Sequence, residues 1–381
     1  MKKREIKQTR ESGMYKIGAL LPLTGKDARY GQWIKEALEL GKEEINQKGG
    51  IKGRELAVVY EDDVASPKKA VLGMKKLCQK FKVPVVFGSW ASSCVSTQIP
   101  IAKKTKTMVL AEAIAPRIES TGGYVLRIQP EAEYYLKRLV PFVYFDLKIK
   151  RVCILNVKND FGITQGRTFK QFFENFGGKI IYSEGFSQGE KNFKTKLIRI
   201  KKEKPEAVFV PAYTEIIPLL KQAKKLKLKV RFLASVPFEN PDILSQTKEA
   251  AERVIYPYHY SPDPNNIVDL RFRKRYKQKY KREPEGFAAL AYDGIYIIAK
   301  ALKNWGQKDR ESLKNEFYKI HHFGVTGEIV FDETGNPIKK IVIKTVKNGK
   351  FIKIKEKREK LYLRKTGEPF PKPYPSYHSL E

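Results

Sequence analysis

The segment GSWASSCVSTQIPIAKK, residues 88–104, gathers several side chains that could do chemistry. Ser92, Ser93, Cys94 and Ser96 follow the apolar run VPVVF and precede a stretch with helical character. Hydroxyls and thiols act as nucleophiles when a base activates them, and they otherwise serve as hydrogen-bonding groups that hold a ligand. The segment therefore predicts either a catalytic nucleophile or a polar ligand-binding shelf.

A catalytic role finds little support in the rest of the chain. The pattern GxSxG is absent, and no histidine lies within the first 250 residues. We expect all four histidines (His259, His321, His322 and His378) in surface or connecting segments. A serine–lysine arrangement stays open, but without an identifiable base the sequence predicts a protein that is not an enzyme.

Metal and disulfide chemistry are also not indicated. The three cysteines, Cys78, Cys94 and Cys153, form no CxxC pair and have no neighbouring histidine. The pair His321–His322 has no carboxylate at metal-ligand spacing. The sequence therefore predicts no metal, no cofactor and no disulfide framework.

Short apolar runs alternate with amphipathic stretches in the first part of the chain. Apolar and β-branched runs predict strands, and helical periodicity predicts helices. The predicted strands are residues 15–23, 55–63, 84–89 and 107–113, and the predicted helices are 30–50, 66–81 and 92–105. This alternation favours a parallel sheet with helices on both faces.

The same alternation restarts after residue 130. The predicted strands are 151–158, 179–186, 206–213 and 230–237, and the helices between them are 162–178, 191–204 and 215–228. Two further helices, 266–282 and 287–305, precede a hairpin-like end at 327–354 with turns at TGNP and NGK. We expect two α/β units, with the helices of this last section packed back onto one of them.

Ser92 then lies at the carboxyl end of a predicted strand and at the start of a predicted helix. Ligands bind at this edge of open α/β sheets, and the free N–H groups of a helix start favour a carboxylate or another electron-rich oxygen. The alternative is a helix cap formed by Ser92 or Ser93 without any ligand. The position favours the ligand-binding shelf.

The chain is strongly basic. Its 75 Lys and Arg residues exceed the 42 Asp and Glu residues, which gives a net charge of +33. The basic residues are spread along the chain, mostly beside glutamates or on helix faces, and no nucleic-acid motif accompanies them. We expect a charge-laced surface of the kind common in heat-adapted proteins, with no nucleic-acid partner.

The N-terminal segment MKKREIKQTRESGMYKIG is basic, and no apolar run of secretory length follows it. We therefore expect no secretory signal in this sequence as written. No window reaches the length of an apolar membrane span. The Pro-rich end, from about residue 356, is expected to be a loosely held tail.

Several longer segments resemble the type I periplasmic solute-binding proteins of ABC importers, in the branched-chain amino acid (Leu/Ile/Val) receptor family. The resemblance covers roughly residues 14–355. It is carried by IGALLPLTGKDARYGQ, INQKGGIKGREL with YEDD, GSWASSCVSTQIPIAKK, NDFGITQGRTF, ALAYDGIYIIAKAL and FGVTGEIVFDETGNP.

The resemblance implies a two-lobed fold in which each lobe is a mostly parallel sheet flanked by helices, with three hinge crossovers. Lobe 1 would contain residues 14–127 and 257–327, and lobe 2 residues 128–256 and 328–355. Residues 1–13 would form an N-terminal extension and residues 356–381 a C-terminal tail. The lobes would close on a small ligand, and the closed monomer would dock on a membrane permease.

The family pattern also implies site residues. Ser92, with Ser93 beside it, matches the serine that receives the ligand's carboxylate, and Trp90 should face the same cleft. Residues 112–114 match a loop that holds the ligand head group. The ligand-binding residues expected from the resemblance and the residues around it are Tyr30, Trp90, Ser92, Ser93, Glu112, Ala113, Ile114, Phe161, Tyr213, Phe238 and Glu239.

Two departures from the family pattern bear on the ligand. Ile114 stands where amino-acid binders have a threonine, and Ser235 or Val236 stands where the Leu/Ile/Val receptor has a glutamate for the ligand's ammonium. A buried ammonium without a carboxylate is costly. Either Glu112 or Glu239 supplies the carboxylate, or the ligand is an amide, a urea-like molecule or an aromatic compound suited to an aromatic-rich pocket.

We therefore expect a receptor that captures a small polar organic molecule, an amino acid or an amide-like compound, and delivers it to an ABC importer. The resemblance places such a receptor in the periplasm or outside the cytoplasm. The alternative is a cytoplasmic amide or amino-acid sensor of the same fold that controls a regulator, which agrees with the missing signal.

Overall fold

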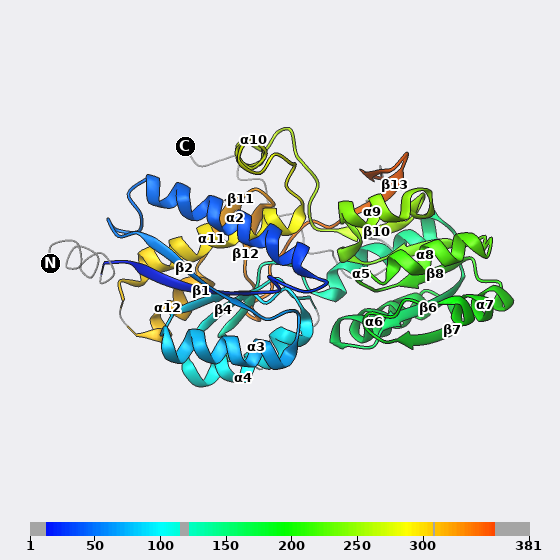
Figure 1. Cartoon of the computed structure of the whole chain (residues 1–381), viewed down its shortest axis with the longest axis horizontal. Coiled ribbons are helices and arrows are strands. Elements are labelled where there is room, and N and C mark those ends of the chain that lie inside the picture. Colours follow the sequence, from blue (N-terminus) through cyan, green and yellow to red (C-terminus); the bar gives the residue numbers. More distant parts are fainter. Residues whose placement is uncertain (1–12, 115–121, 308, 355–381) are drawn as a thin grey trace.

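The computed structural model describes residues 13–114, 122–307 and 309–354. It shows two α/β lobes side by side, each built around its own sheet (Figure 1). The predicted N-terminal extension, apart from Gly13, and the predicted C-terminal tail lie outside the described residues.

The sheet of lobe 1 has five strands in the order β2-β1-β3-β4-β5, all parallel. The strands are β1 (Tyr15–Leu21), β2 (Leu56–Asp62), β3 (Val85–Phe87), β4 (Met108–Ala111) and β5 (Val125–Arg127). The central strands β3 and β4 are buried along their whole length, because helices cover both faces.

The helices of lobe 1 come from both ends of the chain. They are α2 (Ala28–Gln47), α3 (Pro67–Lys75) with the π-turn Lys76–Lys80, α4 (Ser92–Thr105), α10 (Ile267–Tyr280), α11 (Gly286–Trp305) and α12 (Arg310–Tyr318). The apolar helix α11 packs along α2, so the predicted return of the helices of the last section onto one unit is confirmed.

The sheet of lobe 2 has seven strands in the order β14-β13-β10-β9-β8-β6-β7. Its parallel strands are β6 (Arg151–Val157), β7 (Lys179–Phe186), β8 (Ala207–Val210), β9 (Arg231–Ala234) and β10 (Ile255–Tyr258). Two antiparallel strands at one edge, β13 (Val342–Lys347) and β14 (Lys350–Lys353), form the predicted hairpin at the NGK turn.

The helices of lobe 2 follow its strands. They are α5 (Ala132–Pro141) with the π-turn Phe142–Asp146, α6 (Asp160–Asn175), α7 (Lys194–Glu203), α8 (Ile216–Lys225), the short turn η4 (Val236–Phe238), and α9 (Pro241–Thr247) with the turn Lys248–Ala251. Asn159 caps α6 by accepting a hydrogen bond from the N–H of Gly162, which is why this helix begins directly after β6.

The expected hairpin around TGNP is wrong in one respect. β12 (Gly327–Val330) forms an antiparallel pair with the strand that precedes it in the chain, β11 (His321–Gly324). Across the TGNP turn, only the isolated bridge between Phe331 and Pro337 forms. Residues 321–324 were not predicted as a strand, because their two adjacent histidines break the apolar pattern typical of strands. This two-stranded ribbon lies with lobe 1, where the Asp293 side chain on α11 accepts hydrogen bonds from the N–H groups of Val325 and Thr326.

The chain passes between the two sheets three times: after β5, after β10 and after β12. The residue boundaries predicted for the two lobes remain a prediction, because membership of a sheet does not define where an independent unit ends. The α/β architecture with two mostly parallel sheets and three crossovers is as predicted.

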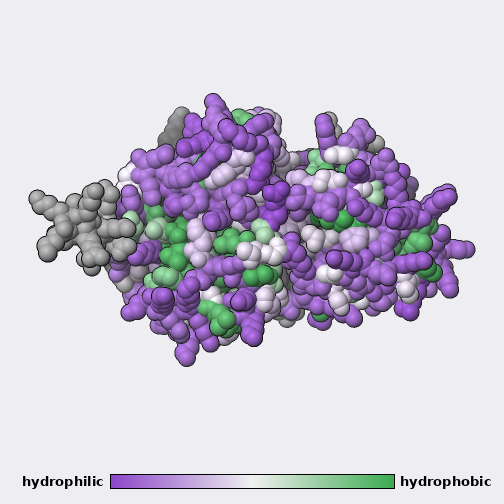
Figure 2. All heavy atoms as spheres, in the orientation of Figure 1, coloured by the Kyte–Doolittle hydropathy of each residue, from purple (hydrophilic) through white to green (hydrophobic). Residues whose placement is uncertain are grey.

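On the face of the molecule shown in Figure 2, polar and charged side chains cover most of both lobes and are interrupted by small apolar patches. Many of the lysines and arginines form ion pairs with glutamates, for example Lys76 with Glu61 and Lys137 with Glu133. This is the charge-laced surface expected from the composition.

Candidate ligand-binding site

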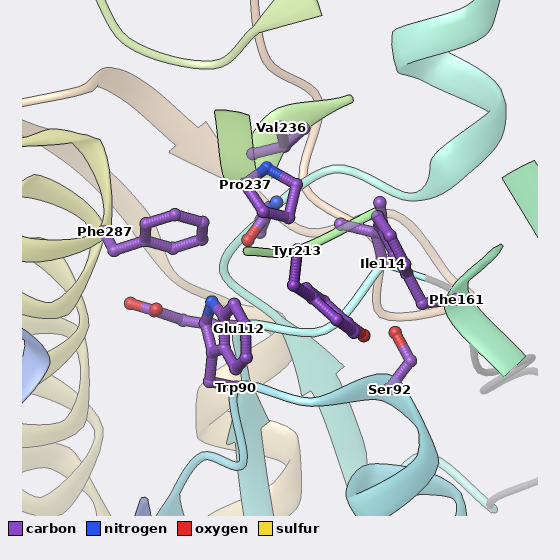
Figure 3. Close-up of a pocket in the computed structure, with 10 residues that line it drawn as sticks. Trp90, Ser92, Glu112, Ile114, Phe161, Tyr213, Val236, Pro237 and Phe287 are labelled. Atoms are coloured by element: carbon purple, nitrogen blue, oxygen red, sulfur yellow. The ribbon is translucent and has the colours of Figure 1, made fainter. Parts of the chain in front are cut away.

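A pocket lies between the lobes, where the carboxyl ends of their parallel strands face each other. Its lining comes from segments that follow β3, β4, β5, β6, β8 and β9 and from the start of α11 (Figure 3). The lining residues are Trp90, Ser92, Glu112, Ile114, Gln129, Phe161, Tyr213, Val236, Pro237 and Phe287.

Aromatic rings from both lobes fill much of this space. Tyr213 of lobe 2 lies with its ring centroid 5.1 Å from that of Trp90 of lobe 1, and it stacks on Phe161 at 4.8 Å. Tyr30 stacks on the far side of Trp90 at 4.2 Å. The remaining volume is ≈ 20 Å³. Because this is room for about one water molecule, the rings or lobes must move apart to admit an organic ligand.

The rim of the pocket carries polar contacts that join the lobes. The Tyr30 hydroxyl donates to the carbonyl of Pro237 at 2.9 Å, and the Ser96 hydroxyl donates to Asp160 at 2.9 Å. Arg29 Nε lies 3.0 Å from an oxygen of Asp242. These contacts define a closed arrangement, although an exposed ion pair of this kind contributes only about 0.2–1 kcal/mol.

The first turn of α4 points its free N–H groups toward the pocket side of lobe 1. α4 begins at Ser92, with Ala91 in the capping position, and runs for 14 residues. Ser92 is buried and its hydroxyl reaches the pocket (Figure 3). A helix start and a hydroxyl together can hold a negatively charged or electron-rich oxygen.

Glu112 supplies the one carboxyl group among the described lining residues. Its side chain is 1% exposed, and neither carboxyl oxygen has a hydrogen-bond partner among the described residues. Burial raises the pKa of Glu112 well above its usual value, and the charge of Glu285 raises it further. An unpaired buried carboxyl of this kind is costly unless it is protonated or meets a ligand.

Comparison with known proteins agrees with this two-lobed geometry. The sequence profile of the periplasmic binding protein family matches residues 14–350, which is most of the chain. The chain belongs to this family.

Individual relatives point to one branch of the family. A leucine-, isoleucine-, valine-, threonine- and alanine-binding protein of Pseudomonas aeruginosa is 29% identical over 330 residues, which cover 84% of this chain and 86% of that protein. A leucine-binding protein of Thermotoga maritima superposes with a TM-score of 0.83 at 26% identity, covering 90% of this chain and 98% of its own.

A branched-chain amino acid transporter substrate-binding protein of Streptococcus pneumoniae, solved with isoleucine, gives a TM-score of 0.82 at 25% identity, covering 90% of this chain and all of its own. The fold is therefore that of type I periplasmic binding proteins, and the chain's relatives are solute-binding proteins of branched-chain amino acid transport. In the described part of the chain, no helix is both long and apolar enough to cross a membrane.

The structure brings six of the eleven residues expected at the site into the pocket wall. These are Trp90, Ser92, Glu112, Ile114, Phe161 and Tyr213. The other five lie outside the lining: Tyr30, Ser93, Ala113, Phe238 and Glu239. Tyr30 still supports the site from behind, through its stacking on Trp90.

Glu239 is engaged elsewhere in lobe 2. One carboxyl oxygen lies 2.5 Å from Lys344 Nζ, and the other accepts a hydrogen bond from the hydroxyl of Tyr256 at 2.7 Å. Burial raises the pKa of Glu239, although Lys344 opposes this shift. A carboxyl held in this way is a poor receptor for a ligand.

Sequence reasoning missed the lining residues Gln129, Pro237 and Phe287, and it named Val236 only as one of two positions matching the family's glutamate. Gln129 follows the short strand β5, which was not among the strands predicted from the sequence. Phe287 opens α11 after the cap Glu285, whose carboxyl accepts hydrogen bonds from the N–H groups of Phe287 and Ala288. A carboxylate cap before an apolar helix was a readable signal for this helix start.

His259 lies in a connecting segment, as expected, but it is buried. His259 is 3% exposed, and its Nδ1 lies 2.9 Å from the hydroxyl of Tyr135. It directly follows β10, in the crossover that leads back to lobe 1. The thiol of Cys94 is also buried, which raises its pKa and makes it a poor nucleophile. No group of metal-ligating side chains occurs among the described residues.

Asp27, near the rim, gives a testable pH effect. It is 2% exposed, neither carboxyl oxygen has a partner among the described residues, and burial raises its pKa from 3.8 to about 6. A carboxyl with a raised pKa destabilises the fold as pH rises through this range. This rise in pKa corresponds to a loss of about 3 kcal/mol in the free energy of unfolding at neutral pH.

We expect Asp27→Asn to raise the free energy of unfolding by up to about 3 kcal/mol at pH 7 and to have little effect at about pH 3, where Asp27 is mostly protonated in both states. Urea unfolding at the two pH values measures this difference. An equal effect at both values would contradict the role of the charge.

Proposed function

We propose that this protein is an extracytoplasmic receptor that captures a small polar organic molecule, an amino acid or an amide-like compound, and delivers it to an ABC importer. The observation that carries the proposal is the pocket between the lobes, walled by side chains of both. A ligand that contacts both walls stabilises the closed form over the open form, and the permease partner can distinguish the two.

The two ends of the pocket suit such a ligand. The N-terminus of α4 and the Ser92 hydroxyl favour an oxygen with negative charge, while Glu112 lies near Phe287 on the other side of Trp90 (Figure 3). Rings of both lobes provide an apolar surface for the body of the molecule. The names of the relatives support an amino acid or a compound of similar size.

The first test is a thermal-shift screen of the purified protein against branched-chain and other amino acids, short amides, urea and small aromatic acids. A ligand that binds only the folded state raises the melting temperature, by an amount that grows with its concentration. If no compound of these classes raised it, a receptor for a small polar solute would be the wrong assignment.

We expect Ser92→Ala to weaken binding of the best compound by about 1–3 kcal/mol, because a donor to a charged or polar oxygen is lost. Isothermal titration calorimetry measures the change. Ser93→Ala is the matched control, since Ser93 lies next to Ser92 in α4 but outside the pocket lining. Equal effects of the two changes would show that the helix start is not the oxygen site.

A further inference from the structure

The polar wall around Glu112 has an unusual composition. Among the described residues that line the pocket there is one carboxylic acid and no lysine, arginine or histidine. The unpartnered buried oxygens of this wall are both oxygens of Glu112 and the Oε1 of Gln129. Carboxylate and amide oxygens accept hydrogen bonds, so a ligand group that donates hydrogen bonds would bind well at this wall.

Aromatic rings line the pocket together with this carboxyl. The Glu112 carboxyl extends past Trp90 toward the side where Phe287 lies (Figure 3). The rings of Trp90 and Phe287 are 6.1 Å apart and meet nearly at right angles. Aromatic faces attract cations, and a carboxylate next to them strengthens this preference.

No neighbouring group supplies a positive charge to Glu112. The titratable groups that interact with it are Glu285, the cap before α11, and Tyr135 on α5. Burial raises the pKa of Glu285 to about 8. Neither group carries a positive charge.

We propose that Glu112 is the receptor for a positively charged nitrogen of the ligand, and that this nitrogen displaces a proton from the Glu112 carboxyl when the lobes close. The inference rests on the proposed receptor function and names the chemical class of its ligand: an amine or an amino acid rather than a carboxylic acid or a neutral amide. The displaced proton passes to the solvent, and the ligand keeps its own.

The raised pKa of Glu112 supports the second half of this proposal. In the ligand-free closed form, burial favours the protonated carboxyl of Glu112 over its charged form. A cation beside it reverses this preference and lowers the pKa. Affinity for a cationic ligand therefore rises with pH, by up to about tenfold per unit below the pKa of the free form, and then levels off.

The test uses four compounds that share one isobutyl group and differ in the polar groups attached to it: L-leucine, isoamylamine, 4-methylpentanoate and 4-methylpentanamide. Titration calorimetry at pH 7 in phosphate and in Tris, which differ in ionisation enthalpy, counts the protons released. We expect leucine and isoamylamine to bind with release of about one proton each, and the acid and the amide to bind at least about tenfold more weakly.

Glu112→Gln keeps the size of the side chain and removes its charge. We expect this change to lower the affinity for isoamylamine by about tenfold to a hundredfold and to abolish both proton release and the pH dependence. The matched control is the double change Glu239→Gln with Lys344→Met, which removes the other candidate carboxyl together with its partner. Its affinity should stay within about twofold of the wild type, because neither residue lines the pocket.

Proton counting needs no variant, so it decides the matter even if Glu112→Gln folds poorly. Binding of isoamylamine or leucine without proton release would overturn the proposal, as would 4-methylpentanoate or 4-methylpentanamide binding as tightly as isoamylamine. Either of those results would leave the receptor function standing. Only the failure of these compounds and of the wider thermal-shift screen would go against the receptor function itself.

Discussion

Replacing Lys344 with methionine is expected to lower the free energy of unfolding by about 3–5 kcal/mol at pH 7. Lys344 on β13 is 4% exposed, and its Nζ lies 2.5 Å from Glu239 and 5.3 Å from the ring centroid of Tyr258. Methionine preserves the length of the side chain but leaves the buried carboxyl of Glu239 without a counter-charge. Most of the lost unfolding free energy comes from that uncompensated charge on Glu239.

The pH dependence of this effect has a definite sign. Burial already raises the pKa of Glu239, and the loss of Lys344 will raise it further. A carboxyl with a raised pKa costs stability above its unfolded value and nothing below it, so the difference between variant and wild type should shrink toward pH 4. Denaturant unfolding at pH 7 and pH 4 measures it.

The double change Glu239→Gln with Lys344→Met is the control for the Lys344 prediction. It removes both charges, and the hydroxyl of Tyr256 can donate to the new amide oxygen as it did to Glu239. We expect most of the lost stability to return, because replacing a whole buried pair is far less costly than breaking it. A double variant as unstable as the single one would mean that Lys344 stabilises the sheet by packing rather than by charge.

The fold could be predicted from the sequence because it depends on local patterns. Runs such as residues 84–89 and 206–213 are apolar along their length, as strands covered on both faces must be, and the helices between them carry readable starts such as Ser66–Pro67. The ribbon of β11 and β12 was missed because its pairing depends on the tertiary anchor at Asp293. No local pattern encodes such an anchor.

The site was predictable only where it follows the strand ends. Ser92 and Tyr213 come directly after buried strands, so their place at the sheet edge follows from the order of elements. Glu239 and Glu112 could not be separated by sequence, because both also come just after a strand. The difference between them is Lys344, which lies 105 residues from Glu239 and reaches it only through the antiparallel edge of lobe 2.

Tyr213→Ala is expected to weaken binding of the best ligand by about 3 kcal/mol or more, at least a hundredfold. The Tyr213 ring is 4% exposed, stacks on Phe161 in its own lobe and lies against Trp90 in the other lobe. Removing it takes away contact area that exists only when the lobes are together, and it leaves a cavity that the closed form cannot fill. Calorimetry measures the affinity.

The same change should also alter the shape of the ligand-free protein. Because Tyr213 and Trp90 hold the lobes together without a ligand, Tyr213→Ala should shift the population toward the open form and increase the radius of gyration in small-angle X-ray scattering. Tyr213→Phe keeps the ring and should keep both the compact shape and most of the affinity. If the alanine variant bound weakly but stayed compact, the ring would serve the ligand alone, and the polar contacts of Tyr30, Arg29 and Ser96 would be sufficient to hold the lobes closed.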